Sequence, residues 1–509
     1  MGGIIMANPV QTNTSQVAQL RSQKSFFGHP KAIGTLSFMQ LCNSFANYGM
    51  SAILVYYLYA AAPEGLGFTQ ENAAQLVSLY SAVSILTGII GSYVADRVLG
   101  PRKALGLARS VQAVAYLCLA IPFLGVYGYV ASQALLCLGT MLSGRSLEAL
   151  TGKMYEKEDK RRDGAFAISY VISNIGAAAP AISGTVALMT GYNVAFAMCA
   201  VFAILGVVSY YATEKKFFGP IGQEPDDPLS PEKKKSFMMK FAIVVVAAVV
   251  VMAVLFTTGI LTINVFANFM STAAIFIPVI YLVYIIKSPK TEKEESKHVL
   301  YLIPMYICNC FAMLVWTQST SILAIYAEQR VNRNLFGFEI TPAAFQTLPA
   351  VLAIIFGIIV TALWTKLGKK QPSAPTKIGI GTIFWGCGPL FMIIPFVLYA
   401  ADVKVSPMWL VMFYVLIIFG EAITNAVGYS SASLVAPKAF TTQMMTVWSM
   451  SQSTGAALST LAVNFYHEGS EATYFLLIGG ITCLVGLLVM VFAKKLEKGM
   501  GLADNKEAE

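Results

Sequence analysis

The sequence is poor in charge. Only 12% of its 509 residues are Asp, Glu, Lys or Arg, whereas 56% are hydrophobic; a soluble domain carries about 25% charged residues. The missing charges leave fourteen apolar stretches, most of them about 20 residues or longer, which is the length that a helix needs to cross a bilayer. This composition excludes a soluble domain and predicts a protein that crosses a membrane many times.

Residues that hold metals or activate nucleophiles are also scarce. The chain has three histidines, scattered near the ends of apolar stretches, and eight cysteines that all lie within such stretches and form no CxxC pair. No GxxxxGK[ST] or GxGxxG motif follows a predicted strand. We therefore expect buried free thiols, no metal site, no cofactor and no enzymatic activity.

The apolar stretches predict an all-α membrane protein with 14 transmembrane helices. The longest gap between them, at 214–240, is rich in proline and charge and predicts a linker. The two spans after it contain no charge between Lys240 and Lys287, which favours a lipid-facing hairpin. The predicted spans lie near 33–60, 74–96, 103–122, 127–150, 165–190, 193–213, 238–258, 264–286, 299–326, 342–368, 376–400, 406–436, 441–466 and 471–494.

Basic residues predict the orientation of the chain. Of the 35 Lys and Arg residues, 30 fall in alternate gaps or termini and only 3 in the opposite gaps. This asymmetry is typical of cytoplasmic loops and argues against a nucleic-acid partner. It predicts a multi-pass plasma-membrane protein with both termini in the cytoplasm and an outside loop at 327–341. Residues 1–32 lack the pattern of a cleavable signal peptide, so we expect the first span to be retained.

Two similar short motifs indicate an internal repeat. LGPRK at 99–103 and LGKK at 367–370 are basic turns at matching places in two blocks of six spans. Such a parallel repeat is typical of the major-facilitator fold. The predicted organisation is an N-terminal tail (1–32), a six-helix bundle (33–213), the linker with its two-helix hairpin (214–298), a second six-helix bundle (299–494) and a C-terminal tail (495–509).

Several longer motifs carry a family resemblance. They are ADRVLG at 95–100, RRD at 161–163 with SYVISNIG at 169–176, NLFGFEI at 334–340 with FQ at 345–346, and GE at 420–421 with YS at 429–430 and AP at 436–437. Together they resemble the proton-dependent oligopeptide transporters, also called the peptide transporter family. The resemblance covers nearly the whole chain. It implies import of di- and tripeptides by proton symport, with the peptide held between the two bundles and the lipid bilayer around them.

The chain departs from the family where charged chemistry is expected. The first-helix Glu-x-x-Glu-Arg motif is replaced by Gln40, Asn43 and Ser44. The charged positions of the fourth and seventh helices are Gly144 and Thr317. Removing one partner of a buried ionic network leaves the others unpaired, whereas removing all of them does not. The resemblance therefore implies peptide transport with proton coupling weakened or rerouted.

Four charges inside the spans are the first candidates for function. Glu421 keeps the tenth-helix family position and could bind the α-ammonium group of a peptide or take up a proton, or it could be a structural carboxyl. Arg145 and Glu148 lie three residues apart on one helix face. Arg145 could bind the peptide carboxylate and Glu148 a proton, or the two could simply neutralise each other. Arg109 is expected to extend to the inner membrane surface.

Neutral side chains complete the predicted binding site. Tyr48, Tyr80, Asn174 and Gln318 could hydrogen-bond a peptide, although single polar residues in spans also join helices. Trp448 and Gln452, one turn apart, could form the wall of a side-chain pocket, although an ordinary packing Trp gives the same pattern. Because most of the family's cations are missing, a carrier of another amphoteric solute and a non-transporting sensor on the same scaffold remain alternatives.

Overall fold

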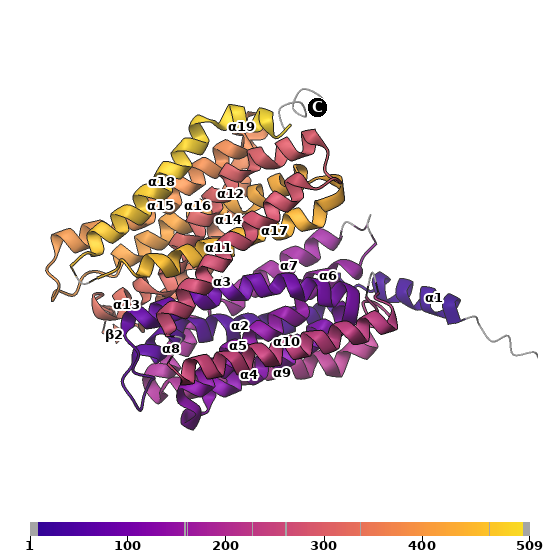
Figure 1. Ribbon diagram of the computed structural model, residues 1–509, viewed down its shortest axis with the longest axis horizontal. Coiled ribbons are helices and arrows are strands. Elements are labelled where there is room, and N and C mark those ends of the chain that lie inside the picture. Colours follow the sequence, from indigo (N-terminus) through magenta and orange to yellow (C-terminus); the bar gives the residue numbers. More distant parts are fainter. Residues whose placement is uncertain are drawn as a thin grey trace, which may run out of the picture. The chain divides into compact units, whose positions relative to one another are not determined.

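The computed structural model is almost entirely helical (Figure 1). It describes residues 9–501 apart from 157, 158, 160, 226, 227, 260, 261, 336 and 468, so the far ends of both predicted tails lie outside the described residues. In an apolar surrounding a helix satisfies its own backbone N–H and C=O groups, which is why the apolar stretches fold in this way. The prediction of an all-α protein is confirmed.

Each predicted span coincides with one helix or with a pair of helices in line. Among the described residues, nine helical segments are long and apolar enough to cross a membrane; the count of fourteen stays a prediction. The helices are α1 (Pro9–Ser22), α2 (Lys31–Tyr59), α3 (Gln70–Val94), α4 (Pro101–Ala120), α5 (Gly125–Ser143), α6 (Ser146–Lys153), α7 (Arg161–Gly176), α8 (Ala179–Thr190), α9 (Tyr192–Phe218), α10 (Pro231–Thr257), α11 (Ile263–Lys287), α12 (Lys293–Thr320), α13 (Ile322–Gln329), α14 (Leu348–Leu367), α15 (Ala374–Leu398), α16 (Met408–Leu434), α17 (Thr441–Val463), α18 (Glu471–Val491) and α19 (Ala493–Gly499).

The chain divides into two compact units by its internal contacts. Unit 1 comprises Met1–Met50, Thr87–Ala179 and Asn193–Ile260, and unit 2 comprises Ser51–Leu86, Pro180–Tyr192 and Leu261–Glu509. The boundary passes through α2 and α3 and separates α10 from α11. The predicted bundle boundaries are a different division of the chain and stay a prediction. Two very short strands, β1 (Asn334–Leu335) and β2 (Phe338–Glu339), form a hairpin within unit 2.

The core of unit 1 forms where α4 packs along α5 and α6. One cluster of buried side chains joins α1, α2, α4, α6 and α9, and includes Leu20, Ile33, Leu105, Leu147 and Tyr210. A second cluster joins the end of α3, the middle of α4 and the end of α5 to Phe237 and Phe241 of α10. Helix α10 is therefore anchored to this unit through its first turns, and these two clusters fix the helices that carry the polar residues described below.

The core of unit 2 forms around α15, which packs along α18 and α16. Small residues explain the close approach of α15 to α18. A Cβ atom on Gly379 would lie 2.7 Å from the carbonyl oxygen of Gly486, and one on Gly386 would lie 2.7 Å from that of Gly479. Larger side chains would separate these backbones, as expected for small residues at intramembrane helix contacts. Helices α11 and α12 pack on α17 in the same unit.

The end of α2 and the start of α3 also belong to unit 2, where polar groups fasten them. The Tyr56 hydroxyl donates a hydrogen bond to the carbonyl oxygen of Ala324 in α13, at 2.9 Å. The Tyr59 hydroxyl donates to the carboxylate of Glu328 at the end of α13. The Gln75 amide of α3 donates to the Oδ1 atom of Asn464, just after α17, at 2.6 Å.

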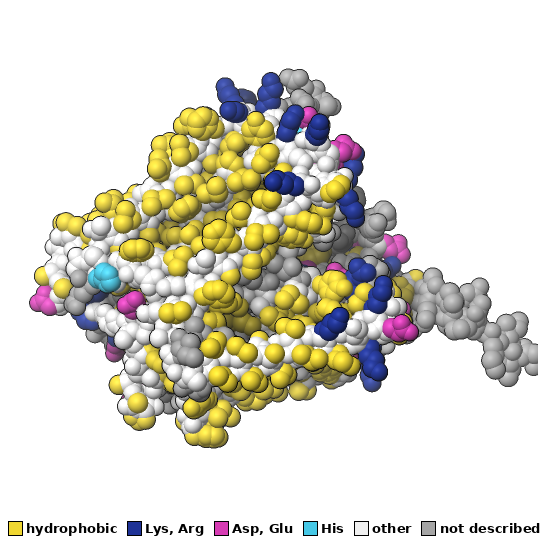
Figure 2. Space-filling model, viewed as in Figure 1, with side chains coloured by type: hydrophobic (Ala, Val, Ile, Leu, Met, Phe, Trp, Pro, Cys, Tyr) yellow, Lys and Arg dark blue, Asp and Glu magenta, His cyan; other side chains and the backbone are white. Residues whose placement is uncertain are grey.

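The surface is apolar along the helices. Figure 2 shows hydrophobic side chains covering the helix sides, with Lys and Arg side chains gathered near helix ends. On α10 the side chain of Val244 is 65% exposed, and on α11 that of Ile280 is 65% exposed. Exposed aliphatic side chains of this kind favour contact with lipid, as predicted for both helices, although the two helices fall in different units.

Candidate functional site

Unit 1 contains a layer of neutral polar side chains at the altered first-helix motif. The Gln40 amide donates to the hydroxyls of Ser44, at 3.3 Å, and of Ser173 in α7, at 3.2 Å. The two serine hydroxyls lie 3.0 Å apart. Helix α7 can come this close to α2 because of Gly176, where a Cβ atom would lie 2.6 Å from that of Ser44. Neutral groups thus bond one another here, without any ion pair among them.

Arg109 of α4 reaches the same turn of α2. Its Nη1 atom donates to the Oδ1 atom of Asn43 and to the Oε1 atom of Gln112, both at 2.7 Å. The expectation that Arg109 extends to the membrane surface is therefore wrong. Two amide oxygens hold its guanidinium between helices, because Asn43 and Gln112 lie close enough in the fold to accept both bonds.

Arg145 and Glu148 form the predicted pair. Their nearest nitrogen and oxygen atoms lie 3.6 Å apart, and the side chains are 64% and 49% exposed. An exposed pair at this distance contributes little to stability. The structure thus agrees with a mutual contact, and it leaves both charged groups accessible.

A break in the fourth span places this pair. Helix α5 ends at Ser143 and α6 begins at Ser146, with Gly144 between them at a φ of 47°. A Cβ atom on Gly144 would lie only 2.3 Å from the backbone nitrogen of Ser92 in α3. Glycine is required here both for its backbone conformation and for the contact with α3. The predicted continuous span 127–150 is therefore two helices.

Two further candidates of unit 1 have partly accessible side chains. Asn174 donates from Nδ2 to the backbone carbonyl of Tyr170, at 3.0 Å, one turn earlier in α7. Tyr48 in α2 is 40% exposed. These environments are compatible both with substrate contact and with helix packing, so a substrate role for Asn174 and Tyr48 stays a prediction.

Glu421 is the charged candidate of unit 2. It lies half-buried in α16, next to Gly420, whose face packs closely on α15. Among the residues that the structure describes, no hydrogen bond or ion pair reaches the Glu421 carboxylate. A carboxylate within an apolar span that has no partner among the described residues is expected to bind a cation or a proton.

Gln318, in contrast, has its partners within the protein. The buried amide donates from Nε2 to the Ser459 hydroxyl and accepts at Oε1 from the Tyr474 hydroxyl, each at 2.9 Å. Thr317 beside it is buried and donates to the carbonyl of Met313, at 2.8 Å. The two bonds of Gln318 join α12 to α17 and α18, which supports the interpretation of Gln318 as a residue that joins helices.

Trp448 is also packed within unit 2. Its side chain is only 2% exposed. The centroid of its ring lies 6.3 Å from that of Tyr306 in α12, with the rings edge-on, and 6.5 Å from that of Tyr429 in α16. This supports the packing alternative for Trp448. Gln452 and Tyr80 are half-buried, and a substrate role for them stays a prediction.

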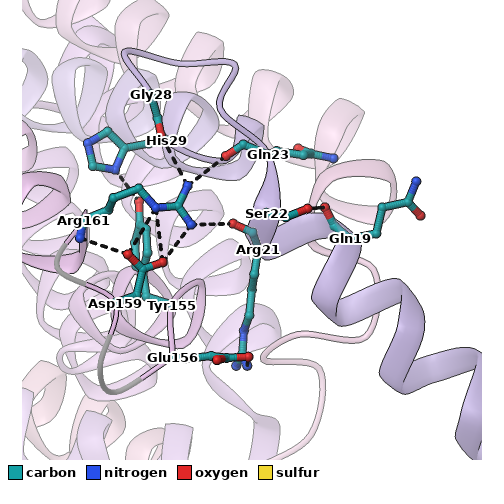
Figure 3. Close-up of polar contacts among 10 residues, drawn as sticks. All are labelled: Gln19, Arg21, Ser22, Gln23, Gly28, His29, Tyr155, Glu156, Asp159 and Arg161. Atoms are coloured by element: carbon teal, nitrogen blue, oxygen red, sulfur yellow. Dashed lines mark hydrogen bonds and ion pairs between the residues drawn. The ribbon is translucent and has the colours of Figure 1, made fainter.

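The N-terminal segment is held by a second polar cluster in unit 1 (Figure 3). Arg161, the first residue of α7, binds the Asp159 carboxylate, with Nη2 to Oδ2 at 2.7 Å. Its guanidinium also donates to the backbone carbonyls of Arg21, Gln23 and Gly28, at 2.9, 3.1 and 3.3 Å. We call this arrangement the Arg161 clamp. It ties the chain between α1 and α2 to the start of α7.

His29 and Tyr155 lie beside the Arg161 clamp. The His29 Nδ1 atom and the Tyr155 hydroxyl are 2.7 Å apart. Burial lowers the pKa of His29 and raises the pKa of Tyr155 to about 12, so both groups are neutral at pH 7. The hydrogen bonds from Arg161 lower the pKa of Asp159, which therefore stays ionised. The sequence offered one signal for this cluster, the RRD motif at 161–163, and none for its partners in the N-terminal segment.

Comparison with known proteins agrees with this architecture. Residues 121–479 match the POT family. The chain is 34% identical over 480 residues to the uncharacterized transporter YclF of Bacillus subtilis (strain 168), covering 94% of this chain and 96% of that protein. It is 32% identical over 490 residues to the di-/tripeptide transporter of Lactococcus lactis subsp. cremoris, covering 94% and 98%.

A solved structure shows the same fold. The crystal structure of the peptide transporter POT in complex with sulfate superposes with a TM-score of 0.91 at 35% identity, covering 96% of this chain and 99% of that one. The similarity extends over both units, so the predicted major-facilitator fold is confirmed.

Proposed function

The chain belongs to the POT family, and we propose that it carries di- and tripeptides across the plasma membrane by alternating access. The observation that carries this proposal is Glu421. The carboxylate lies within an apolar span and has no partner among the described residues. Every free peptide brings an α-ammonium group, which is the cation that such a carboxylate binds with a charge-assisted hydrogen bond.

The contacts at the end of α2 support a transport cycle. Tyr56 and Tyr59 bind groups of α13, where Glu328 lies within the predicted outside loop at 327–341, and Gln75 of α3 binds Asn464 just after α17. In the predicted organisation these partners come from different bundles. We propose that a transport cycle which moves the two predicted bundles apart at this end has to break these three bonds. The basic residues support the proposal that both termini lie in the cytoplasm.

Proton coupling is proposed to be weak. The acids of the first-helix motif are replaced by Gln40 and Asn43, which bond neutral hydroxyls and a guanidinium and carry no titratable proton. Any remaining coupling would pass through Glu421 or Glu148, the two acids within the spans that form no ion pair with a buried cation among the described residues.

Uptake into proteoliposomes tests the proposal. Purified protein is reconstituted, and accumulation of a labelled dipeptide is followed with and without an inward proton gradient. We expect saturable uptake that unlabelled di- and tripeptides inhibit, with little effect of the gradient. Empty liposomes and the Glu421→Gln variant are the controls. Binding of peptide without uptake would favour the non-transporting sensor, and uptake that peptides do not inhibit would favour a carrier of another amphoteric solute.

A further inference from the structure

The altered first-helix motif lies beside a cation that comes from another helix. Where the family resemblance predicts an acid, the chain has Asn43, and where it predicts an arginine, the chain has Ser44. The structure brings the guanidinium of Arg109, from α4, to 2.7 Å from the Asn43 amide oxygen. A positive charge is therefore present at this level of α2, although the motif itself is neutral.

The partners of Arg109 hold its position and leave its charge uncompensated. Asn43 and Gln112 each accept one hydrogen bond at Nη1, and both are neutral amides. The Nε atom has no hydrogen-bond partner among the described residues. Among the residues that the structure describes, no carboxylate lies within ion-pair distance of Arg109. Glu148 acts on Arg109 electrostatically, but it is paired with Arg145. The three charges leave a net charge of one positive unit.

A fixed, uncompensated guanidinium within a membrane span is costly unless an anion binds it. We propose that Arg109 binds the carboxylate end of the transported peptide, taking over the cationic role that the motif has lost. This inference rests on the proposed function. Two bonds orient the guanidinium beforehand, so that binding does not have to immobilise it. The planar fork of a guanidinium also suits a carboxylate.

The neutral residue at position 43 is part of this arrangement. A carboxylate at that position would form an ion pair with Arg109 and neutralise the positive charge that is proposed to bind the peptide carboxylate. Asn43 accepts the same hydrogen bond without cancelling that charge. Arg145 is less suited to the role, because its side chain is 64% exposed and its charge is shared with Glu148. Water weakens the attraction of such an exposed group for a carboxylate.

The inference is tested by comparing a free dipeptide with its C-terminal amide as competitors for binding. We expect wild-type protein to prefer the free dipeptide, and Arg109→Gln to weaken the free dipeptide about 10- to 100-fold while hardly affecting the amide. Lys103→Gln removes an exposed charge from the same helix and is the matched control, which should keep the preference. If Arg109→Gln weakens both competitors equally or keeps the preference, the inference is overturned. It is also overturned if Arg145→Gln abolishes the preference while Arg109→Gln does not.

A second variant keeps the test valid if Arg109→Gln fails to fold. Asn43→Asp keeps the shape of the side chain and the acceptor oxygen for Arg109 and neutralises the guanidinium, so it should reduce the preference to the same extent. A preference that survives Asn43→Asp would overturn the inference. Wild-type protein that neither binds nor transports any dipeptide would overturn the proposed function instead. Wild-type transport with an unchanged preference in both variants would overturn only the role of Arg109.

Discussion

Replacing Glu421 with glutamine removes one negative charge from α16 and keeps the size of the side chain. In the proposed function this carboxylate binds the α-ammonium group of the peptide. A hydrogen bond to a charged group contributes about 1.5–3 kcal/mol, and each 1.4 kcal/mol corresponds to about a factor of ten in affinity. We therefore expect Glu421→Gln to weaken the binding of free peptides about 10- to 100-fold.

The structure also predicts what this substitution leaves unchanged. No described residue loses a hydrogen bond or an ion pair when Glu421 becomes neutral. The melting temperature of the purified variant should therefore equal or exceed that of the wild-type protein. If Glu421 were instead a structural carboxyl bonded to a neighbouring helix, removing its charge would leave a partner unsatisfied and lower the melting temperature.

The assay is competition between a labelled dipeptide and two unlabelled ones, one with a free and one with an N-acetylated amino terminus. The acetylated peptide has no ammonium group, so the substitution should hardly affect it. Equal weakening of both peptides, together with a lower melting temperature, would refute the reasoning and establish the structural alternative for Glu421.

Three other properties can be measured in the same preparation or in intact cells. In a cysteine-free background, Asn334→Cys should react with an impermeant thiol reagent added outside, and labelling only after permeabilisation would contradict the predicted orientation. Uptake should gain little from a proton gradient, and steep gradient-driven accumulation that survives Glu421→Gln combined with Glu148→Gln would refute the proposed coupling. The pKa of His29 is lowered in the folded protein, so its contribution to stability is complete above the unfolded value of 6.5 and is lost as the pH falls below it. Backbone amides of residues 21–33 should therefore lose protection from hydrogen exchange on acidification, once the rates are corrected for the intrinsic effect of pH. The loss should be smaller in Tyr155→Phe. Equal protection at pH 7.5 and 5.5 would exclude a stabilising role for His29.

The positions of the helices could be predicted because the bilayer imposes a minimum length of apolar sequence. Every predicted span coincides with helical structure. The interruptions could not be predicted, since hydropathy averages over many residues and is insensitive to backbone conformation. Gly144 breaks the fourth span because α3 approaches it closely, and that approach depends on packing between distant parts of the chain. The break between α12 and α13, at Ser321, is equally invisible to a hydropathy pattern.

The candidate site was predictable only for isolated charges. Glu421 stood out because a lone carboxylate in an apolar stretch is rare, and the structure leaves it without a described partner. Arg109 was misjudged, because its acceptors Asn43 and Gln112 are recognisable only once α2 and α4 are packed together. For Gln318 the sequence left a substrate role and a helix-joining role open, since nothing in the sequence around it reveals the hydroxyls of Ser459 and Tyr474.

The Arg161 clamp has a consequence for how the N-terminal segment tolerates change. Arg161 binds this segment through backbone carbonyls, which every residue possesses whatever its side chain. Most substitutions at Gln23 or its neighbours therefore leave those bonds intact, the exception being Gly28, whose φ of 85° disfavours other residues. An insertion or deletion instead shifts the carbonyls out of reach. Apart from residues whose side chains form bonds of their own, such as His29, the segment should thus tolerate substitutions during evolution while its length stays fixed.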